Sequence, residues 1–233
     1  MAMDKSRTSP FVKTMIVILA VSFVLGIGGF AGAGLSSCSA NTSLLPGGTS
    51  TGTPGASADT TAQIQAINLR FTPQLSTREA SITADPKNYD LLVAQGNDYY
   101  DWASQISSIA KTISPETAAL WGNAATFYQR ALAVKPGDPN VATDCAIALF
   151  YAGKTDDAIK LAEQTRKDNP TFSPVVFNLG IFYENSSAAD GKAKAIAAYQ
   201  DYLKLDPNGA NAANAKQFLS QLGASATATG TGN

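Results

Sequence analysis

The sequence predicts an all-α fold: a helical solenoid of about three helix-turn-helix repeats with a capping helix, preceded by an N-terminal transmembrane or signal segment. The first observation is proline spacing, because Pro136 and Pro170 lie thirty-four residues apart and Pro207 follows three residues late. The second is that each proline closes an amphipathic segment, such as Tyr-Gln-Arg-Ala-Leu-Ala-Val-Lys before Pro136. A single hairpin cannot bury its apolar face without a neighbour, so self-similarity at this period predicts a stacked array.

The chain begins with a basic segment, residues 1–13, which carries Lys5, Arg7 and Lys13. Residues 14–35 follow as a run without charge, long enough to cross a bilayer core. No basic residue comes after this run until Arg70. This asymmetry predicts a cytoplasmic N-terminus and extracytoplasmic repeats, as in a single-pass signal anchor of a bacterial envelope protein.

Three fates of residues 14–35 stay open. The run is longer than the apolar core of a cleaved signal, which favours a retained anchor. Leu35-Ser36-Ser37-Cys38 resembles the lipobox of bacterial lipoproteins, which implies cleavage before Cys38 and lipidation of its sulfur. Ordinary cleavage after Ala31-Gly32-Ala33 is the third fate.

Residues 36–60 are mostly Ser, Thr, Gly and Pro, which predicts a flexible linker because they cannot bury enough apolar surface to fold. Residues 223–233 have a similar composition and are expected to be a disordered tail. Residues 61–86 carry spaced apolar side chains and predict a helix that covers the first repeat, kinked at Pro73.

The repeats share more than proline. Twelve residues before each closing proline stands a small residue, Ala124, Ala158 or Ala195, and the third copy contains Leu179-Gly180. In this register the chain resembles the tetratricopeptide repeat (TPR) family. The resemblance implies repeats at residues 87–138, 139–172 and 173–208, and a capping helix at 209–222.

The middle copy departs most from the family pattern. Cys145-Ala146 stand in place of Leu-Gly, and Ala162 stands in place of an aromatic residue. The first copy has about sixteen extra residues between Gly96 and Ala124, with apolar positions at helical spacing. We therefore expect both helices of the first hairpin to be longer by about two turns.

Local signals predict several helix starts and turns. Ser114-Pro115, Asp138-Pro139 and Ser173-Pro174 each pair a capping side chain with a first-turn proline. Gly153 predicts the turn of the second hairpin, and residues 185–190 predict a loose turn in the third.

Composition argues against an enzyme. The chain has no histidine, which removes the commonest general base and metal ligand, and two cysteines cannot make a structural zinc site. Cys145 falls on a helix seam and is expected to be a core residue, although a disulfide with Cys38 is an alternative. From residue 36 onward there are fourteen basic and seventeen acidic residues without a basic stripe, so no nucleic-acid binding is predicted. The sequence predicts no catalytic residue, metal or cofactor.

The family resemblance implies that the first helix of each hairpin lines a concave protein-binding groove. By register, the implied groove residues are Val93, Asn97, Tyr100, Asp101, Thr143, Ile147, Phe150, Tyr151, Phe177, Asn178, Ile181 and Glu184. This set is apolar and aromatic with two acids and no Lys or Arg, unlike the family's clamp for C-terminal carboxylates. It favours a protein or peptide partner with an apolar or aromatic motif and one basic residue.

The alternative is that some of these rings pack on neighbouring helices and leave no open patch. Trp102 and Trp121, in the long hairpin, are expected to be core residues. The predicted function is a non-enzymatic interaction scaffold tethered to the membrane of the bacterial cell envelope. The alternative function is a lipoprotein that binds a small solute or envelope component.

Overall fold

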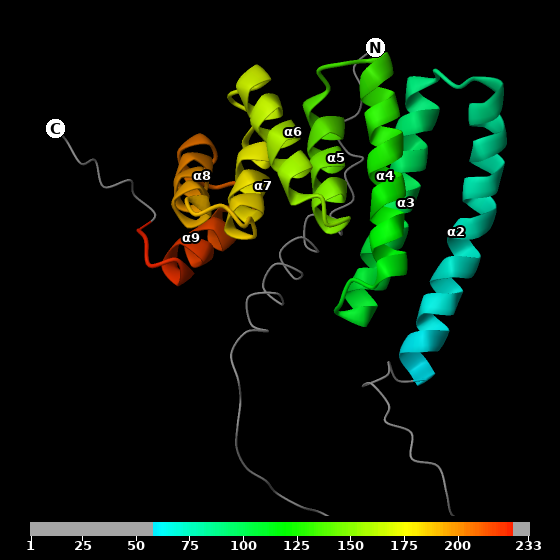
Figure 1. Cartoon of the computed structure of the whole chain (residues 1–233), viewed down its shortest axis with the longest axis horizontal. Helices are drawn as coiled ribbons and strands as arrows, with labels where there is room; N and C mark the ends of the chain where they lie inside the picture. The colour runs from blue at the N-terminus through cyan, green and yellow to red at the C-terminus, as the bar shows by residue number, and fades with distance from the viewer. Residues whose placement is uncertain (1–57, 226–233) are drawn as a thin grey trace, which may run out of the picture.

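In the computed structural model, residues 58–225 are described, and they form helices and turns without a strand. Eight helices follow one another in this range: α2 (Ala58–Ala84), α3 (Tyr89–Ala110), α4 (Pro115–Val134), α5 (Pro139–Tyr151), α6 (Thr155–Asp168), α7 (Ser173–Glu184), α8 (Gly191–Leu205) and α9 (Ala212–Gln221). Each packs on the next along the chain, and α5 also contacts α7. Figure 1 shows the helices standing side by side in one curved row. The predicted all-α class with consecutive hairpins is confirmed for this part of the chain.

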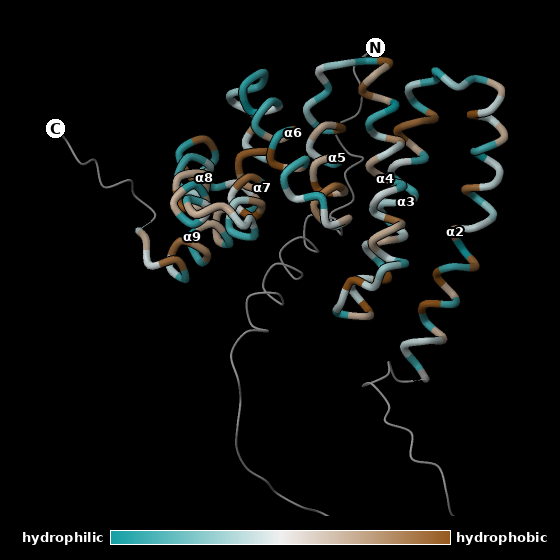
Figure 2. Tube along the Cα trace, in the orientation of Figure 1, coloured by the Kyte–Doolittle hydropathy of each residue, from teal (hydrophilic) through white to brown (hydrophobic). Residues whose placement is uncertain are grey.

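Hydrophobic and hydrophilic segments alternate along each helix (Figure 2), as expected for helices that bury one face. The buried residues form one continuous cluster that runs from Ile82 in α2 to Leu219 in α9. Ala124, Ala158 and Ala195, the small residues of the repeat pattern, have no exposed surface. At these positions the absence of a long side chain lets the two helices of a hairpin approach closely.

The first hairpin is longer than the others, as predicted. α3 has 22 residues and α4 has 20, whereas α5 has 13 and α6 has 14. α3 ends at Lys111, whose φ of 59° is the left-handed conformation of a helix C-cap. α4 begins after Ser114, whose side chain accepts a hydrogen bond from the Thr117 amide at 3.2 Å. The extra residues therefore extend both helices, which reach lower than α5 and α6 in Figure 1.

Two of the three predicted capping side chains act as expected. Besides Ser114, Asp138 accepts from the Asn140 amide at 3.0 Å. The prediction for Ser173 is wrong, because α7 begins at Ser173 itself and Phe172 occupies the cap position without a side-chain hydrogen bond. One residue inside the helix, the Ser173 hydroxyl instead lies 3.2 Å from the Asp206 carboxylate after α8.

The predicted N-terminal helix covers α3 with Phe71, Leu75 and Ile82, all buried. It starts at Ala58, three residues before the predicted boundary, and contains Pro73. Figure 1 shows that α2 bends about halfway along its length. Proline has no amide hydrogen and clashes with the preceding turn, which accounts for a bend in this region.

Pro86, which follows α2, extends the proline register and was missed in the sequence. Once the sixteen extra residues of the first hairpin are discounted, Pro86 lies thirty-four positions before Pro136. Glu79 precedes Pro86 by seven residues, as Glu163 precedes Pro170. α2 therefore has the register of a second helix of a preceding hairpin, and this explains how it fits the face of α3.

α9 covers the other end of the row. Phe218 is buried, with its ring centroid 5.3 Å from that of Tyr199 and 6.2 Å from that of Phe177. Terminal elements of a solenoid must shield the apolar face of the last repeat, and α9 does this for α8.

Within residues 58–225 no helix is both long and apolar enough to span a membrane. The predicted basic segment 1–13, membrane segment 14–35, Cys38 and most of the linker and tail lie outside the described residues.

Candidate binding surface

The structure divides the predicted groove residues into a core set and a surface set. Phe177 shows why, because its ring is 1% exposed and lies 5.3 Å from the Tyr202 ring, centroid to centroid. Its side chain holds α7 to α8 and cannot meet a partner. The buried members of the predicted set are Tyr100, Thr143, Ile147, Phe177, Asn178 and Ile181. For these six, the alternative expectation of core packing holds.

The remaining members reach solvent. Val93, Asn97 and Asp101 follow one another at steps of four along α3, and residues so spaced share one helix face. Asn97 is exposed and the others are half-buried. We call the surface set the first-helix face: Val93, Asn97, Asp101, Phe150, Tyr151 and Glu184, together with Asp144.

Aromatic packing fixes the middle of the first-helix face. The Phe150 ring lies 5.2 Å from Tyr151 and 5.0 Å from Phe182. The Tyr151 ring lies 4.9 Å from Trp121, which is 1% exposed. One side of each half-buried ring is thus held by the core, which orders it at little further entropic cost on binding.

The predicted core role of Trp121 is confirmed by that burial. Trp102 is half-buried, stacks on Phe71 at 5.8 Å and donates from its indole nitrogen to Asn68 at 2.8 Å. It therefore joins α2 to α3 and lies between helices, as expected for a packing residue.

Asp144 is the member that sequence reasoning missed. It stands two residues before Ala146, the same offset that separates Asn178 from Gly180. Because Asn178 was assigned to the groove, the same register would have assigned Asp144 to it as well. Asp144 is half-buried and makes no hydrogen bond or ion pair with the rest of the described chain.

The surroundings of Asp144 disfavour the charged form of its carboxylate. Burial, together with the negative charges of Asp138 and Asp101, raises its pKa to about 7. Burial also raises the pKa of Asp101, which Arg70 partly opposes. The Arg70 guanidinium lies over the Phe71 ring and donates to Gln105, and it forms no ion pair with Asp101. Two neighbouring acids thus lie on the first-helix face without a cation paired to either.

Asn178 adds an unsatisfied acceptor one repeat further along. It is 5% exposed, and its Nδ2 donates to the Pro174 carbonyl at 2.9 Å. Its Oδ1 has no hydrogen-bond partner. Buried polar atoms in folded proteins nearly always find a partner, so an orphaned oxygen in this position is unusual.

Glu184, at the far end of the face, differs from these acids because its carboxylate already has a hydrogen-bond partner. Its carboxylate accepts from the Tyr199 hydroxyl at 3.0 Å. Burial raises the pKa of Glu184, and the tyrosine hydrogen bond opposes that rise.

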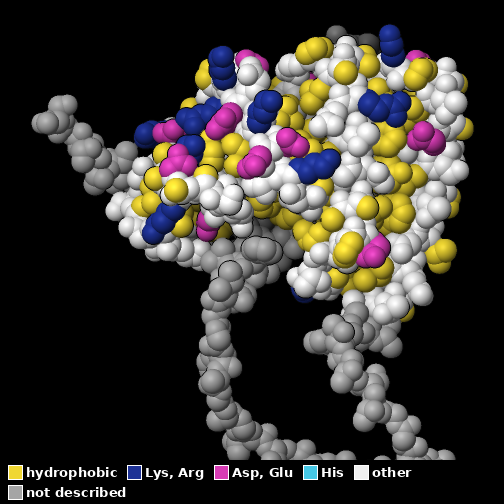
Figure 3. Space-filling view, viewed as in Figure 1, with side chains coloured by type: hydrophobic (Ala, Val, Ile, Leu, Met, Phe, Trp, Pro, Cys, Tyr) yellow, Lys and Arg dark blue, Asp and Glu magenta, His cyan; other side chains and the backbone are white. Residues whose placement is uncertain are grey.

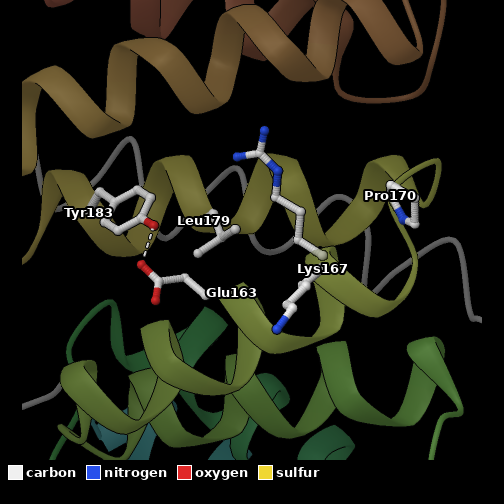
Figure 4. Close-up of a pocket in the computed structure, with 6 residues that line it drawn as sticks. Glu163, Lys167, Pro170, Leu179 and Tyr183 are labelled. Atoms are coloured by element: carbon white, nitrogen blue, oxygen red, sulfur yellow. Dashed lines mark hydrogen bonds between the residues drawn. The ribbon is translucent and has the colours of Figure 1, made fainter.

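A cleft also lies on the joint between the second and third hairpins (Figure 4), with a volume of about 380 Å³. Tyr183 of α7 donates to Glu163 of α6 at 2.6 Å across it, and Arg166 bonds Asp201 at 2.6 Å. Leu179 of α7 and Lys167 of α6 also line the cleft. Its lining residues come from α6, α7 and the turn between them, so the cleft lies at a joint between repeats. A second cleft of about 400 Å³ is lined by Pro86, Lys87, Arg130, Ala133 and Val134.

The described residues contain no group of three His, Cys, Asp or Glu side chains that could hold a metal ion. Cys145 has no exposed surface and its Sγ lies 3.6 Å from the Ala125 carbonyl oxygen. Burial raises the pKa of this thiol to about 12, so it is protonated and inert near neutral pH. The expected core role of Cys145 is confirmed.

Charged side chains of both signs are intermingled over the α6 to α8 end in the view of Figure 3, whereas hydrophobic side chains show more over α2 to α4. This side of the molecule therefore carries no stripe of one sign.

No family model and no curated protein matches the chain. Among solved structures, MamA matches with 18% identity and a TM-score of 0.35, over 59% of this chain and 89% of the other. YrrB, described as a TPR protein with an unusual peptide-binding site, matches with 16% identity and a TM-score of 0.38, over 70% of this chain and all of the other. Likenesses at this identity and TM-score carry no residue roles to this chain.

Proposed function

We propose that this chain is a non-enzymatic scaffold that captures a segment of another protein along the first-helix face. The proposal rests on the packing of Phe150 and Tyr151. Each ring contacts core rings on one side and is partly exposed to solvent on the other. Rigid aromatic side chains of this kind are typical anchors of protein interfaces. The adjacent unpaired acceptors supply polar groups for a partner.

We further propose that the scaffold works on the extracytoplasmic side of a membrane, tethered by residues 14–35 or by lipid on Cys38. The support is in the sequence, where the uncharged run follows Lys5, Arg7 and Lys13. Cys38→Ser separates the two tethers in cell fractionation. A retained anchor leaves the variant in the membrane fraction, whereas lipidation predicts its release.

Site-specific photocrosslinking in intact cells tests the interaction. A photoreactive amino acid at Asn97 probes the first-helix face, and one at Lys160, exposed on α6, serves as the matched control. We expect a discrete crosslinked partner from position 97 that Phe150→Glu abolishes, and none from position 160. Equal products from both positions, or a product insensitive to Phe150→Glu, would contradict the proposal.

The alternative of a small-solute binder predicts a different result. Both clefts are large enough for a small ligand. However, in the cleft of Figure 4 the Glu163 carboxylate already accepts from Tyr183, and Arg166 already pairs with Asp201. A solute that raised the melting temperature while position 97 gave no crosslink would favour this alternative.

A further inference from the structure

Two carboxylates of the first-helix face have no hydrogen-bond donor or cation paired with them within residues 58–225. Asp101 and Asp144 make no ion pair, and the buried Oδ1 of Asn178 has no hydrogen-bond partner. α5, which carries Asp144, is in direct contact with α7, which carries Asn178. Asp101 and Asp144 therefore remain without a positive partner from the described chain.

The described part of the chain supplies no positive charge to Asp144. The charges that act on it come from Asp138 and Asp101, and both are negative. The phenol groups of Tyr100 and Tyr128 feel its charge as well, and each is deeply buried. Tyr128 already donates its hydroxyl to Asn97 at 2.8 Å and is not available to Asp144.

A cation bound at these carboxylates would offset the repulsion between them and form charge-assisted hydrogen bonds. Buried acids without a partner are costly for a folded protein, and such costs persist mainly where function needs them. The flanking aromatic rings of Tyr151 and Phe150 suit a guanidinium group, which stacks on ring faces while its N–H groups bond carboxylates.

We infer that the first-helix face selects a protein segment carrying an arginine or lysine side chain, which Asp101 and Asp144 bind together while Phe150 and Tyr151 hold the apolar residues beside it. This inference rests on the proposed function and names the partner's chemistry: one basic residue within an apolar or aromatic stretch. Of the two cations, arginine fits better, because its planar fork donates several N–H groups to carboxylates while its face stacks on aromatic rings.

Fluorescence anisotropy with four labelled peptides tests the inference on the full-length protein in a mild detergent. The peptides share a ten-residue sequence of Leu, Phe and Gly and differ only at the centre, which is Arg, Lys, Ala or Glu. We expect the Arg peptide to bind at least tenfold more tightly than the Ala peptide, and the Glu peptide to bind most weakly. The preference should shrink when NaCl is raised from 50 to 500 mM.

Asp101→Asn with Asp144→Asn should reduce the Arg-to-Ala ratio to within about twofold while leaving the Ala peptide unaffected. The matched control is Asp156→Asn with Asp157→Asn, which removes two exposed carboxylates from the first turn of α6. Its ratio should equal that of the unmodified protein. Circular dichroism of each variant confirms that the helices are retained.

The failures of the two proposals are distinguishable. If all four peptides bind equally and Phe150→Glu abolishes binding, the face captures apolar segments and the selection of a basic residue is overturned. If the Arg preference survives the double Asp substitution, the carboxylates are not the selecting groups and the inference is likewise overturned. If none of the peptides binds and position 97 gives no crosslink, the proposed function and the inference fail together.

Discussion

Gly180 lies against the ring of Tyr199, and any side chain at Gly180 would overlap that ring. The same relationship recurs in the long hairpin, where a Cβ at Gly96 would lie 2.6 Å from Tyr128 Cε1. Tyr199 has no exposed surface and cannot swing away. In both hairpins, the glycine of the first helix exists because an aromatic ring of the second helix fills its place.

Gly180→Ala is therefore expected to destabilise the protein by about 1–3 kcal/mol, the range typical of overpacked cores. Urea denaturation followed by circular dichroism measures the change. Gly122 in α4 is the matched control, since a Cβ there would meet nothing within 4 Å. Gly122→Ala should stabilise the helix by roughly 0.5–1 kcal/mol. If Gly180→Ala stabilised the protein as much as Gly122→Ala, the Tyr199 ring would relax at no cost and the predicted clash would be absent.

In the middle hairpin, alanine replaces both the glycine and the aromatic residue of this pair. Ala146 stands at the glycine position and Ala162 at the aromatic position, and both are fully buried. Seen alone, each residue departs from the repeat pattern. Together they are complementary, because a methyl group gained on α5 accompanies a ring lost from α6.

This complementarity predicts coupling between the two positions. Ala162→Tyr alone should destabilise the protein by about 2 kcal/mol, since the ring meets the Ala146 methyl group. Adding Ala146→Gly should recover more than about 1 kcal/mol, although glycine within a helix normally costs that much. A double-mutant cycle measures the interaction energy. Additive effects would show that the two side chains do not share one space.

Most of the fold could be predicted because the repeat signal lies in local sequence. Proline spacing, small residues at close approaches and the helical spacing in the long hairpin all reflect contacts between neighbouring helices. Pro86 was overlooked since the sixteen extra residues hide its register. The prediction that Ser173 caps a helix was wrong because α7 begins one residue earlier than the capping pattern predicts.

The binding surface was harder to predict than the fold. The repeat register names the residues on the first helices, but it does not say which of them the next hairpin covers. Phe150 and Phe177 occupy neighbouring repeats and were both expected in the groove, yet only Phe150 keeps open surface. What separates them is packing against α8 and α9, which depends on residues far along the chain.

These two phenylalanines can be separated by experiment. Phe177→Glu should unfold the third hairpin or lower stability by more than about 3 kcal/mol, because it buries a charge among rings. Phe150→Glu should cost less than about 2 kcal/mol and leave the helical circular dichroism signal unchanged, while abolishing the crosslink from position 97. If Phe150→Glu also unfolds the protein, that ring is part of the core and the first-helix face loses its anchor.

Asp144 gives the protein a predictable response to pH. Its pKa of about 7 in the folded state exceeds the ordinary value of 3.8, so between these values the folded chain holds a proton that the unfolded chain has lost. The contribution of Asp144 to stability therefore falls as pH rises from about 4 to above 7. The expected loss from this group is on the order of 2–4 kcal/mol. Urea denaturation at pH 5 and pH 8 measures it.

Asp144→Asn removes the titrating group and should leave the protein more stable than the unmodified chain at pH 8, but not at pH 4. Asp157→Asn, which keeps Asp144 and removes an exposed carboxylate, should retain the fall in stability between pH 5 and pH 8. A residue kept for packing alone would not combine a gain in stability with a loss of binding when it is replaced. If Asp144→Asn lowers stability at pH 8, the carboxylate has a partner in the folded protein, and a basic ligand is not needed to explain it.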